Sequence, residues 1–183
     1  LGYPIAMILA EAGLSKRNFL VALFVIPMWM NFLARTYAWM TLLEKNGLIN
    51  ALLEFLNLPA INILYTDKAV ILGMIYNFLP FMVLPIYSVL SKTDKSLIEA
   101  AQDLGATPVT TFIKVIFPLS LPGVLSGITM VFMPAVTTFV ISRLLGGGQF
   151  TLIGNLIEKQ FLTTGDWGFG SALSMVLMVI ILF

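Results

Sequence analysis

The chain has 183 residues, of which 59% are hydrophobic and only 10% are charged, and its net charge is +1. A soluble domain carries roughly 25% charged residues, so this composition indicates that a lipid bilayer surrounds most of the chain. So small a net charge gives no reason to expect a nucleic-acid partner. The sequence contains no cysteine and no histidine, which excludes disulfides and removes the commonest general base and metal ligand. We therefore expect neither catalysis nor a metal site in this chain.

The predicted fold class is all-α: a polytopic bundle of transmembrane helices, forming one domain over residues 1–183. Five apolar segments follow one another, at residues 1–13, 19–43, 69–90, 121–145 and 168–183. A helix rises ~1.5 Å per residue, so the longer segments reach across a hydrocarbon core of ~30 Å. Backbone groups in lipid must be paired within the segment, which predicts a helix for each span. The first and last segments are short, and we expect a piece of a longer protein, truncated at both ends.

The segments that connect the spans alternate in charge. Residues 14–18 and 91–120 carry five basic side chains, Lys16 among them, against three acids, whereas residues 44–68 and 146–167 carry three lysines against five acids. The positive-inside rule places the first pair in the cytoplasm and the second pair outside. A mildly acidic outer face would attract a cation, although ordinary solvated loop ends explain the same residues.

Residues 91–120 are predicted to form two short helices. Asp94 or Ser96 can cap the first helix, and Gly105 stands where the backbone needs a positive φ after its end. Thr107 and Pro108 have the residue types of an N-cap and a first helical position, so a second helix begins there. We expect that helix to stop at Pro118.

The same segment carries a spaced motif. Glu99-Ala100-Ala101 is followed after three residues by Gly105 and after nine more by Val115-Ile116-Phe117-Pro118. This pattern resembles the EAA loop of ABC-importer permeases, the family of binding-protein-dependent transport permeases, with Val115 in place of Ile and Phe117 in place of Leu. The resemblance implies a permease fold and a cytoplasmic coupling loop at about residues 91–120, on which an ATPase docks.

A coupling loop must be short and rigid and must let a partner approach closely. Small side chains at Ala100 and Ala101 allow that approach, while Glu99 and Asp103, four residues apart, share one helix face and can meet basic groups. The predicted coupling residues are Glu99, Ala100, Ala101, Asp103 and Gly105. The simpler alternative is an amphipathic connector that lies on the membrane surface.

Motifs elsewhere in the chain are similar to those of spermidine/putrescine importer permeases. They lie at residues 35–39, 46–50, 76–82, 145–148, 153–157 and 160–162. The resemblance implies a polyamine importer in the bacterial inner membrane. Its partners would be a sister permease, two cytoplasmic ATPase subunits and an extracytoplasmic polyamine-binding protein. The chain itself lacks the phosphate-binding G-x-x-x-x-G-K-[ST] pattern, so ATP and magnesium would be bound by the ATPase and no cofactor by this chain.

Polar and aromatic residues within the spans are candidates for the transport pathway. The carboxamide oxygens of Asn31 and Asn77 can accept hydrogen bonds from an ammonium group. Tyr37, Trp39 and Tyr76 can offer aromatic faces to a cation. Packing or an interfacial aromatic belt is an equally good interpretation of the three aromatic residues.

Arg35 lies within a span, where an unpaired charge costs at least about 2.5–3.5 kcal/mol. An arginine on the path would repel a polycation, so we expect a structural or gating role, with the guanidinium bonded to helix-end carbonyls or an outer carboxylate.

Alternative functions remain open at this point. The same class of importer could carry another small organic cation, or an anion such as sulfate. A secondary transporter would want acids or histidine in its spans, and an intramembrane enzyme would want a buried Ser/His or Asp pair. The spans contain neither set.

Finally, Gly123 and Gly127 form a small-residue pattern typical of helix packing.

Overall fold

The computed structural model describes residues 1–182, except for the side chains of residues 14–16. Lys16, counted above among the cytoplasmic charges, therefore has its side chain outside the described part. Every regular element within the described residues is a helix, which confirms the all-α prediction. The chain divides into two compact units, Leu1–Trp29 with Phe78–Phe132, and Met30–Asn77 with Met133–Phe183. The helices α5 and α8 each contribute to both units.

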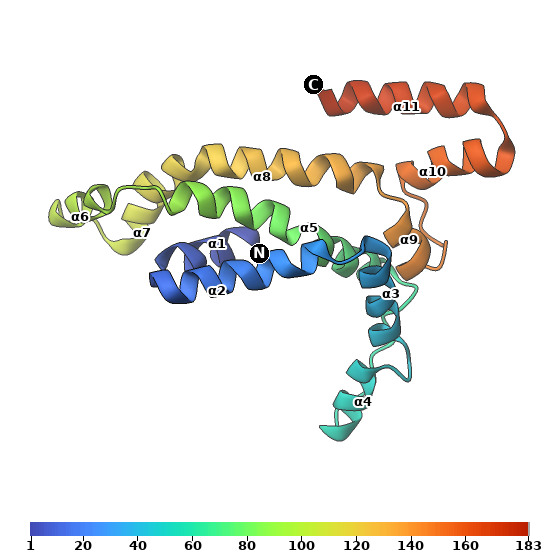
Figure 1. The fold of residues 1–183 in the computed structure, drawn as a ribbon, viewed down its shortest axis with the longest axis horizontal. Helices are drawn as coiled ribbons and strands as arrows, with labels where there is room; N and C mark the ends of the chain where they lie inside the picture. The colour runs from blue at the N-terminus through green and yellow to red at the C-terminus, as the bar shows by residue number, and fades with distance from the viewer. Residues whose placement is uncertain (183) are drawn as a thin grey trace. The chain divides into compact units, whose positions relative to one another are not determined.

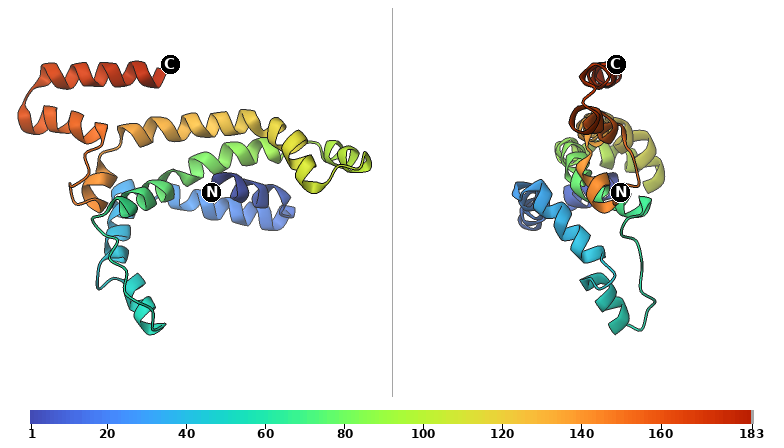
Figure 2. Two further views of the ribbon diagram at one scale, coloured as in Figure 1. Left: turned by 180° about the vertical axis from the view of Figure 1, so that it is seen from behind. Right: turned by 90° about the vertical axis from the view of Figure 1, so that its right-hand side faces the viewer.

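The first unit is built around a hairpin of two helices that packs on α5 (Figures 1 and 2). Ala6 and Leu9 of α1 meet Val83 and Ile86 of α5 in a core from which water is excluded. The elements of this unit are α1 (Gly2–Glu11), α2 (Leu14–Val25), the 3₁₀ turn Ile26–Trp29, α5 (Asp67–Leu90, second part), α6 (Lys95–Asp103), α7 (Pro108–Thr111), the π-turn Phe112–Ile116 and α8 (Phe117–Thr137, first part).

Glycines let α8 approach α5 closely in this unit. A Cβ atom on Gly123 would lie 2.9 Å from the carbonyl oxygen of Pro85, and one on Gly127 would lie 2.8 Å from the sulfur of Met82. The atom facing Gly123 is backbone, so only glycine fits there, whereas at Gly127 the Met82 side chain would have to shift. The small-residue pattern predicted from the sequence is therefore a helix-packing contact within the chain.

The second unit contains α3, α4, α9 and the C-terminal hairpin of α10 and α11. Leu43, Ala69 and Leu145 form its buried core, and α11 folds back along α10 (Figures 1 and 2). Its elements are α3 (Phe32–Leu43), α4 (Leu48–Phe55), α5 (first part), α8 (last part), α9 (Val140–Leu145), α10 (Ile153–Lys159), the π-turn Gln160–Thr164 and α11 (Trp167–Leu182).

Asn50 fixes the irregular stretch after α4. Its side-chain amide donates to the carbonyl oxygens of Glu44 (3.1 Å) and Ile61 (3.0 Å), and its oxygen accepts from the Ile61 N–H (2.8 Å). Asn50 is only 5% exposed. One buried side chain thus satisfies three backbone groups that have no helical partner.

Two spans predicted as continuous helices are broken, and those predictions were wrong. In residues 19–43 the helix ends before Asn31, whose side-chain oxygen accepts from the N–H groups of Leu33 (2.8 Å) and Ala34 (3.3 Å) and starts α3. In residues 121–145, α8 ends at Thr137 and α9 begins at Val140. The carbonyl oxygen of Phe139, the N-cap of α9, accepts both the first helical hydrogen bond, from the Arg143 N–H (3.1 Å), and one from the Asn155 side-chain amide (3.0 Å).

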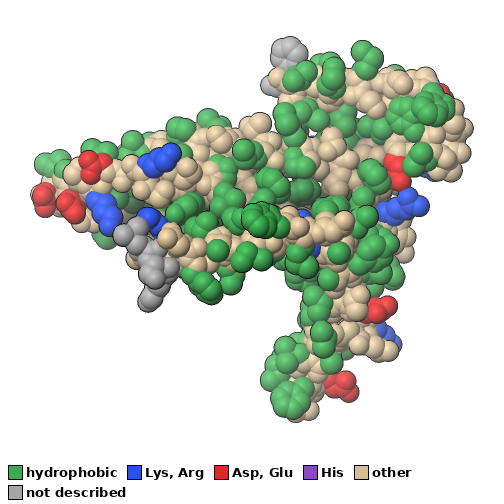
Figure 3. All heavy atoms as spheres, viewed as in Figure 1, with side chains coloured by type: hydrophobic (Ala, Val, Ile, Leu, Met, Phe, Trp, Pro, Cys, Tyr) green, Lys and Arg blue, Asp and Glu red, His purple; other side chains and the backbone are tan. Residues whose placement is uncertain are grey.

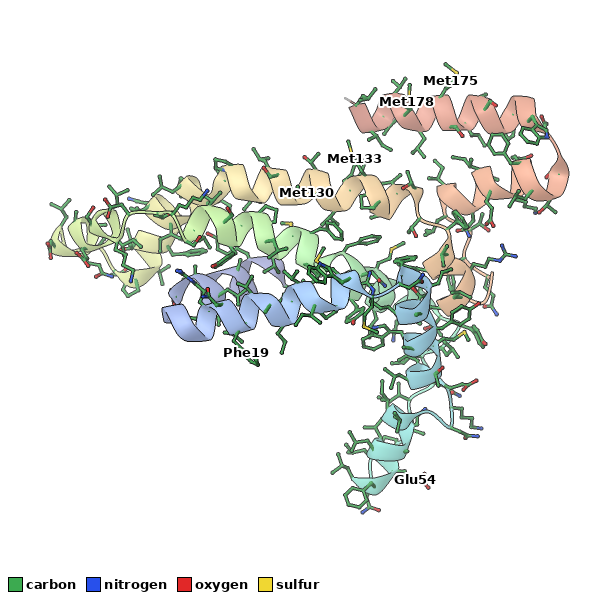
Figure 4. All side chains as sticks on the ribbon, in the orientation of Figure 1. Phe19, Glu54, Met130, Met133, Met175 and Met178 are labelled. Atoms are coloured by element: carbon green, nitrogen blue, oxygen red, sulfur yellow. The ribbon has the colours of Figure 1, made fainter. Side chains whose placement is uncertain are left out.

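Two described helices are long and apolar enough to cross a membrane, Asp67–Leu90 and Pro108–Thr137, or three if the broken pair Arg17–Trp29 and Phe32–Phe55 is one span. Large apolar side chains cover much of the surface (Figure 3). Phe19, for example, is 68% exposed and points away from the other helices of its unit (Figure 4). Exposed apolar surface on this scale fits a chain whose solvent is lipid.

Candidate coupling and pathway sites

The first helix of the predicted coupling loop has well-defined ends. Asp94 is its N-cap, with a carboxylate oxygen that accepts from the Ser96 N–H at 3.0 Å. This backbone hydrogen bond, helped by one from the Ser96 hydroxyl, lowers the pKa of the exposed Asp94 carboxyl. Ser96, the alternative cap suggested by the sequence, is the second residue of the helix. Asp94 therefore holds the start of α6.

The far end of α6 closes around a left-handed glycine. Gly105 has φ +81°, as the sequence predicted. Its N–H donates to the carbonyl of Gln102 (2.9 Å), and the Ala106 N–H donates to the carbonyl of Ala101 (3.1 Å). These two bonds make a Schellman motif, in which positive φ is favourable only for glycine and, less so, asparagine. The turn is thus rigid and specified locally.

The predicted coupling residues lie together on α6 and in the turn that follows it. Glu99, Ala100, Asp103 and Gly105 are exposed, and Ala101 is half-buried. Two exposed apolar side chains lie beside them, Leu104 (89% exposed) and Val109 (67%). Sequence reasoning missed both. The available signal was the position of Leu104 at the C-cap of α6, directly before the left-handed glycine, because the regular helix ends there. Figure 3 shows acidic and basic side chains gathered at this end of the unit.

The second helix of the loop does not stop at Pro118, so that prediction was wrong. Thr107 caps α7 by accepting from the Thr110 N–H (3.3 Å), as predicted. The helix then widens into the π-turn Phe112–Ile116, where the Phe117 N–H reaches the carbonyl of Phe112, and passes into α8. Residues 108–137 thus form one helix of 30 residues. The wide turn accommodates Pro118, which has no N–H to donate to the helix.

Tyr3 of α1 packs against this π-turn. Its hydroxyl lies 2.7 Å from the hydroxyl of Ser120. Its ring meets Phe112 edge-on at 5.6 Å between centroids and Phe117 at 6.0 Å. The first helix of the chain therefore supports the joint between the loop and α8.

The second unit brings two of the predicted pathway residues together. Trp39 of α3 and Tyr76 of α5 meet edge-on with centroids 5.1 Å apart. Tyr37 is 49% exposed and lies two residues from Trp39, so the two rings point to different faces of α3. Arg35 shares a face with Trp39 at a spacing of four residues. Trp39 and Tyr76 are thus the two predicted pathway aromatics that the structure places in contact.

The remaining polar candidates have local structural contacts. Asn31 caps α3, ~12 Å along the helix from Trp39. Asn77 is 2% exposed and donates to the carbonyl of Gly73 (2.9 Å), while its oxygen has no partner among the described residues. The Nε of Arg35 is also buried and, in the described part of the chain, unbonded. The hydrogen bonds expected for the Arg35 guanidinium are therefore not seen at this atom.

A polar network in the second unit escaped sequence reasoning. The side-chain oxygen of Asn155 accepts from the Ser142 hydroxyl and from the Leu152 N–H (3.1 Å), and Arg143 pairs with Glu158 at 2.7 Å. Glu158 is the charged residue among the described side chains that line a cavity of about 570 Å³ beside α10 and α11. Only the fold brings these residues together, since Asn155 lies in the first turn of α10 and Ser142 in α9.

Comparison with known proteins gives the family. Residues 2–183 match the family described as "Binding-protein-dependent transport system inner membrane component". The spermidine/putrescine transport system permease protein PotB is 44% identical over 98% of this chain in Escherichia coli K12, and 42% identical over 100% in Haemophilus influenzae. The chain belongs to this family of inner-membrane transport components, and the predicted membrane localisation is confirmed.

A further relative and a solved structure agree with this assignment. The inner membrane ABC transporter permease protein YdcU of Escherichia coli K12 is 33% identical over 99% of the chain. A bacterial ABC transporter involved in the import of the acidic polysaccharide alginate contains a similar chain, with a TM-score of 0.78 at 18% identity, over 100% of this chain and 69% of that one. That likeness shows the fold alone. The chain spans 66% of the length of the two PotB proteins and 62% of YdcU.

Proposed function

We propose that the chain is a permease subunit of an ATP-driven polyamine importer, in which residues 91–120 transmit the motion of an ATPase to the spanning helices. The observation that carries the proposal is the continuous path from α6 to α8. A capped helix and a Schellman turn lead into one helix of 30 residues, which is long enough to cross the membrane. A push on α6 is therefore delivered to a span and is not absorbed by a flexible linker.

The exposed surface of α6 supports the docking role. Glu99 and Asp103 are exposed and four residues apart, so their carboxylates share a face that suits basic groups of an ATPase. The side chain of Leu104 is 89% exposed, and its burial against a partner would remove apolar surface from water. A protein surface that carries both basic and apolar groups would contact all three side chains.

The complex that we propose has the parts that the family resemblance implies. A sister permease completes the path, two cytoplasmic ATPase subunits bind ATP and magnesium, and an extracytoplasmic binding protein delivers the cargo. Closure of the ATPase dimer moves α6 and switches the path from inward-facing to outward-facing. This chain itself holds no cofactor and performs no hydrolysis.

The cargo proposal rests on the PotB relatives, whose printed names specify spermidine and putrescine. Trp39 and Tyr76 are the best candidates to line the path, because the faces of aromatic rings attract ammonium groups. Their edge-to-face contact holds the two rings in place. Tyr37, Asn31 and Asn77 stay secondary candidates, and Arg35 has a structural or gating role. Recognition of the cargo is assigned mainly to the binding protein.

Uptake by the complete reconstituted complex tests the proposal. Labelled spermidine or putrescine should be taken up with ATP inside the system, and unlabelled polyamines but not sulfate should compete. Trp39→Leu should slow uptake without changing capture by the binding protein, while Trp29→Leu, at an 86% exposed tryptophan, serves as the control. Uptake of anions without polyamines would reject the cargo and leave the importer class standing.

A further inference from the structure

A second cavity, of about 480 Å³, lies in the first unit beside the start of the coupling loop. The turn between α1 and α2, the end of α5 and the start of α6 surround it. Its described lining is mixed and includes apolar side chains, such as Met7 and Leu90, as well as charged ones. The charged members are Glu11, Arg17 and Lys95.

The charges on the described side chains of this cavity are not balanced. Two basic groups face one acid, and the only salt bridge within the described residues is Arg143–Glu158, so neither Arg17 nor Lys95 is neutralised by an ion pair. The Nε of Arg17 is buried and has no hydrogen-bond partner in the described part of the chain. A buried guanidinium donor without an acceptor is costly, and an anion in the cavity would remove that cost.

We propose that this cavity binds the phosphate of an anionic phospholipid, with Arg17 and Lys95 on the headgroup and the apolar side chains of the lining against the start of an acyl chain. Basic pockets between spanning helices at the cytoplasmic face bind such headgroups. The proposal rests on the orientation proposed above, in which residues 91–120 face the cytoplasm, and it does not depend on the cargo.

The mixed lining favours a lipid over a carboxylate of the ATPase. A carboxylate would satisfy Arg17 but would leave Met7 and Leu90 without an apolar neighbour, whereas a phospholipid supplies both groups. The position also has a consequence for coupling. Lys95 and Ile98 belong to α6, while Arg17 belongs to α2, so a bound lipid would tie the coupling helix to the first hairpin.

The test uses the intact transport complex in detergent, with phosphatidylglycerol or phosphatidylcholine added and retained lipid measured by native mass spectrometry. The double variant Arg17→Gln with Lys95→Gln removes both basic groups from the cavity. Lys92→Gln with Lys114→Gln makes the same charge change at two exposed lysines outside its lining. Each basic group near an anionic lipid is worth roughly fivefold in affinity, so phosphatidylglycerol retention should fall by about 25-fold in the first variant and stay unchanged in the second.

Three outcomes would reject the lipid. Equal retention of phosphatidylcholine would mean that the charges do not select the headgroup. Displacement of phosphatidylglycerol by inorganic phosphate at equal concentration would make the cavity a small-anion site. Loss of ATPase association by the double variant in phosphatidylcholine alone, with lipid retention unchanged, would assign the basic groups to the ATPase. Labelling of Ser96→Cys in intact cells tests the orientation separately. A wrong orientation can therefore be told apart from a wrong lipid assignment.

Discussion

The hydroxyl of Tyr3 lies 2.7 Å from the hydroxyl of Ser120, a contact between residues 117 positions apart in the sequence. Ser120 also donates to the carbonyl of Phe117 at 2.8 Å. The contact therefore ties α1 to the first turn of α8, directly after the π-turn. Because Tyr3 also packs on Phe112, one side chain holds both sides of the joint through which α6 would move the span.

Tyr3→Phe and Tyr3→Leu should separate the two parts of this contact. Phenylalanine loses only the hydrogen bond, worth about 0.5–1.5 kcal/mol, whereas leucine also loses ring contacts worth about 0.5–1.5 kcal/mol. We expect both variants to insert, with thermal unfolding of the complex lowered more by leucine, and ATPase stimulation reduced in the same order. Phe19→Leu, at a 68% exposed ring, is the control. Equal effects of all three would show that the joint is not held by Tyr3.

The crossing of α5 and α8 should not tolerate a methyl group at Gly123. A Cβ atom there would meet the backbone of Pro85 and Ile86, at 2.9 and 3.1 Å, so the helices must move apart. Overpacking of this kind costs about 1–3 kcal/mol. Gly123→Ala should thus lower the thermal stability of the complex, while Gly168→Ala, whose Cβ would meet only Asp166 at 3.6 Å, should not. Unchanged stability of the Gly123 variant would mean that the two helices are packed less closely than described.

The parts of the candidate site that the sequence predicts correctly depend on neighbours within a few residues. Asp94 as one of two possible caps, Gly105 at positive φ and Thr107 before Pro108 all follow from local hydrogen bonding and backbone sterics. The spacing of the motif then identifies the loop. The same local logic should have revealed Asn31 as a cap, but the apolar run from residue 19 to 43 outweighed one polar residue.

The features that the sequence could not predict depend on residues far apart in the chain. The break at Phe139 is stabilised by the side chain of Asn155, and the ion pair joins Arg143 to Glu158. The π-turn, which replaces the predicted stop at Pro118, is packed against Tyr3. None of these pairs has a periodic signal, because each exists only after the helices have assembled.

Single cysteines can test the orientation, because the chain contains no cysteine of its own. Ser96→Cys and Asn62→Cys place thiols at exposed positions, one in the coupling loop and one in the stretch between α4 and α5. Asn62 is preferable to Asn57, whose φ of +54° disfavours a cysteine. An impermeant maleimide should label residue 62 in intact cells and residue 96 only after permeabilisation. The reverse pattern would invert the proposed orientation, and with it the role of residues 91–120.

The left-handed turn at Gly105 provides the sharpest test of coupling. A Cβ atom at Gly105 would have no neighbour within 4 Å, so Gly105→Ala introduces backbone strain of about 1 kcal/mol without a clash. Gly105→Asn tolerates positive φ, and Gly105→Pro both fixes φ near −65° and removes the N–H that bonds to Gln102. Transport and cargo-stimulated ATP hydrolysis should therefore fall in the order asparagine, alanine, proline, with proline inactive, while the amount of inserted protein stays constant. Glu99→Lys should act on docking instead, lowering ATPase association with the α6 turn intact. Full transport by the proline and lysine variants together would show that the loop only connects two spans.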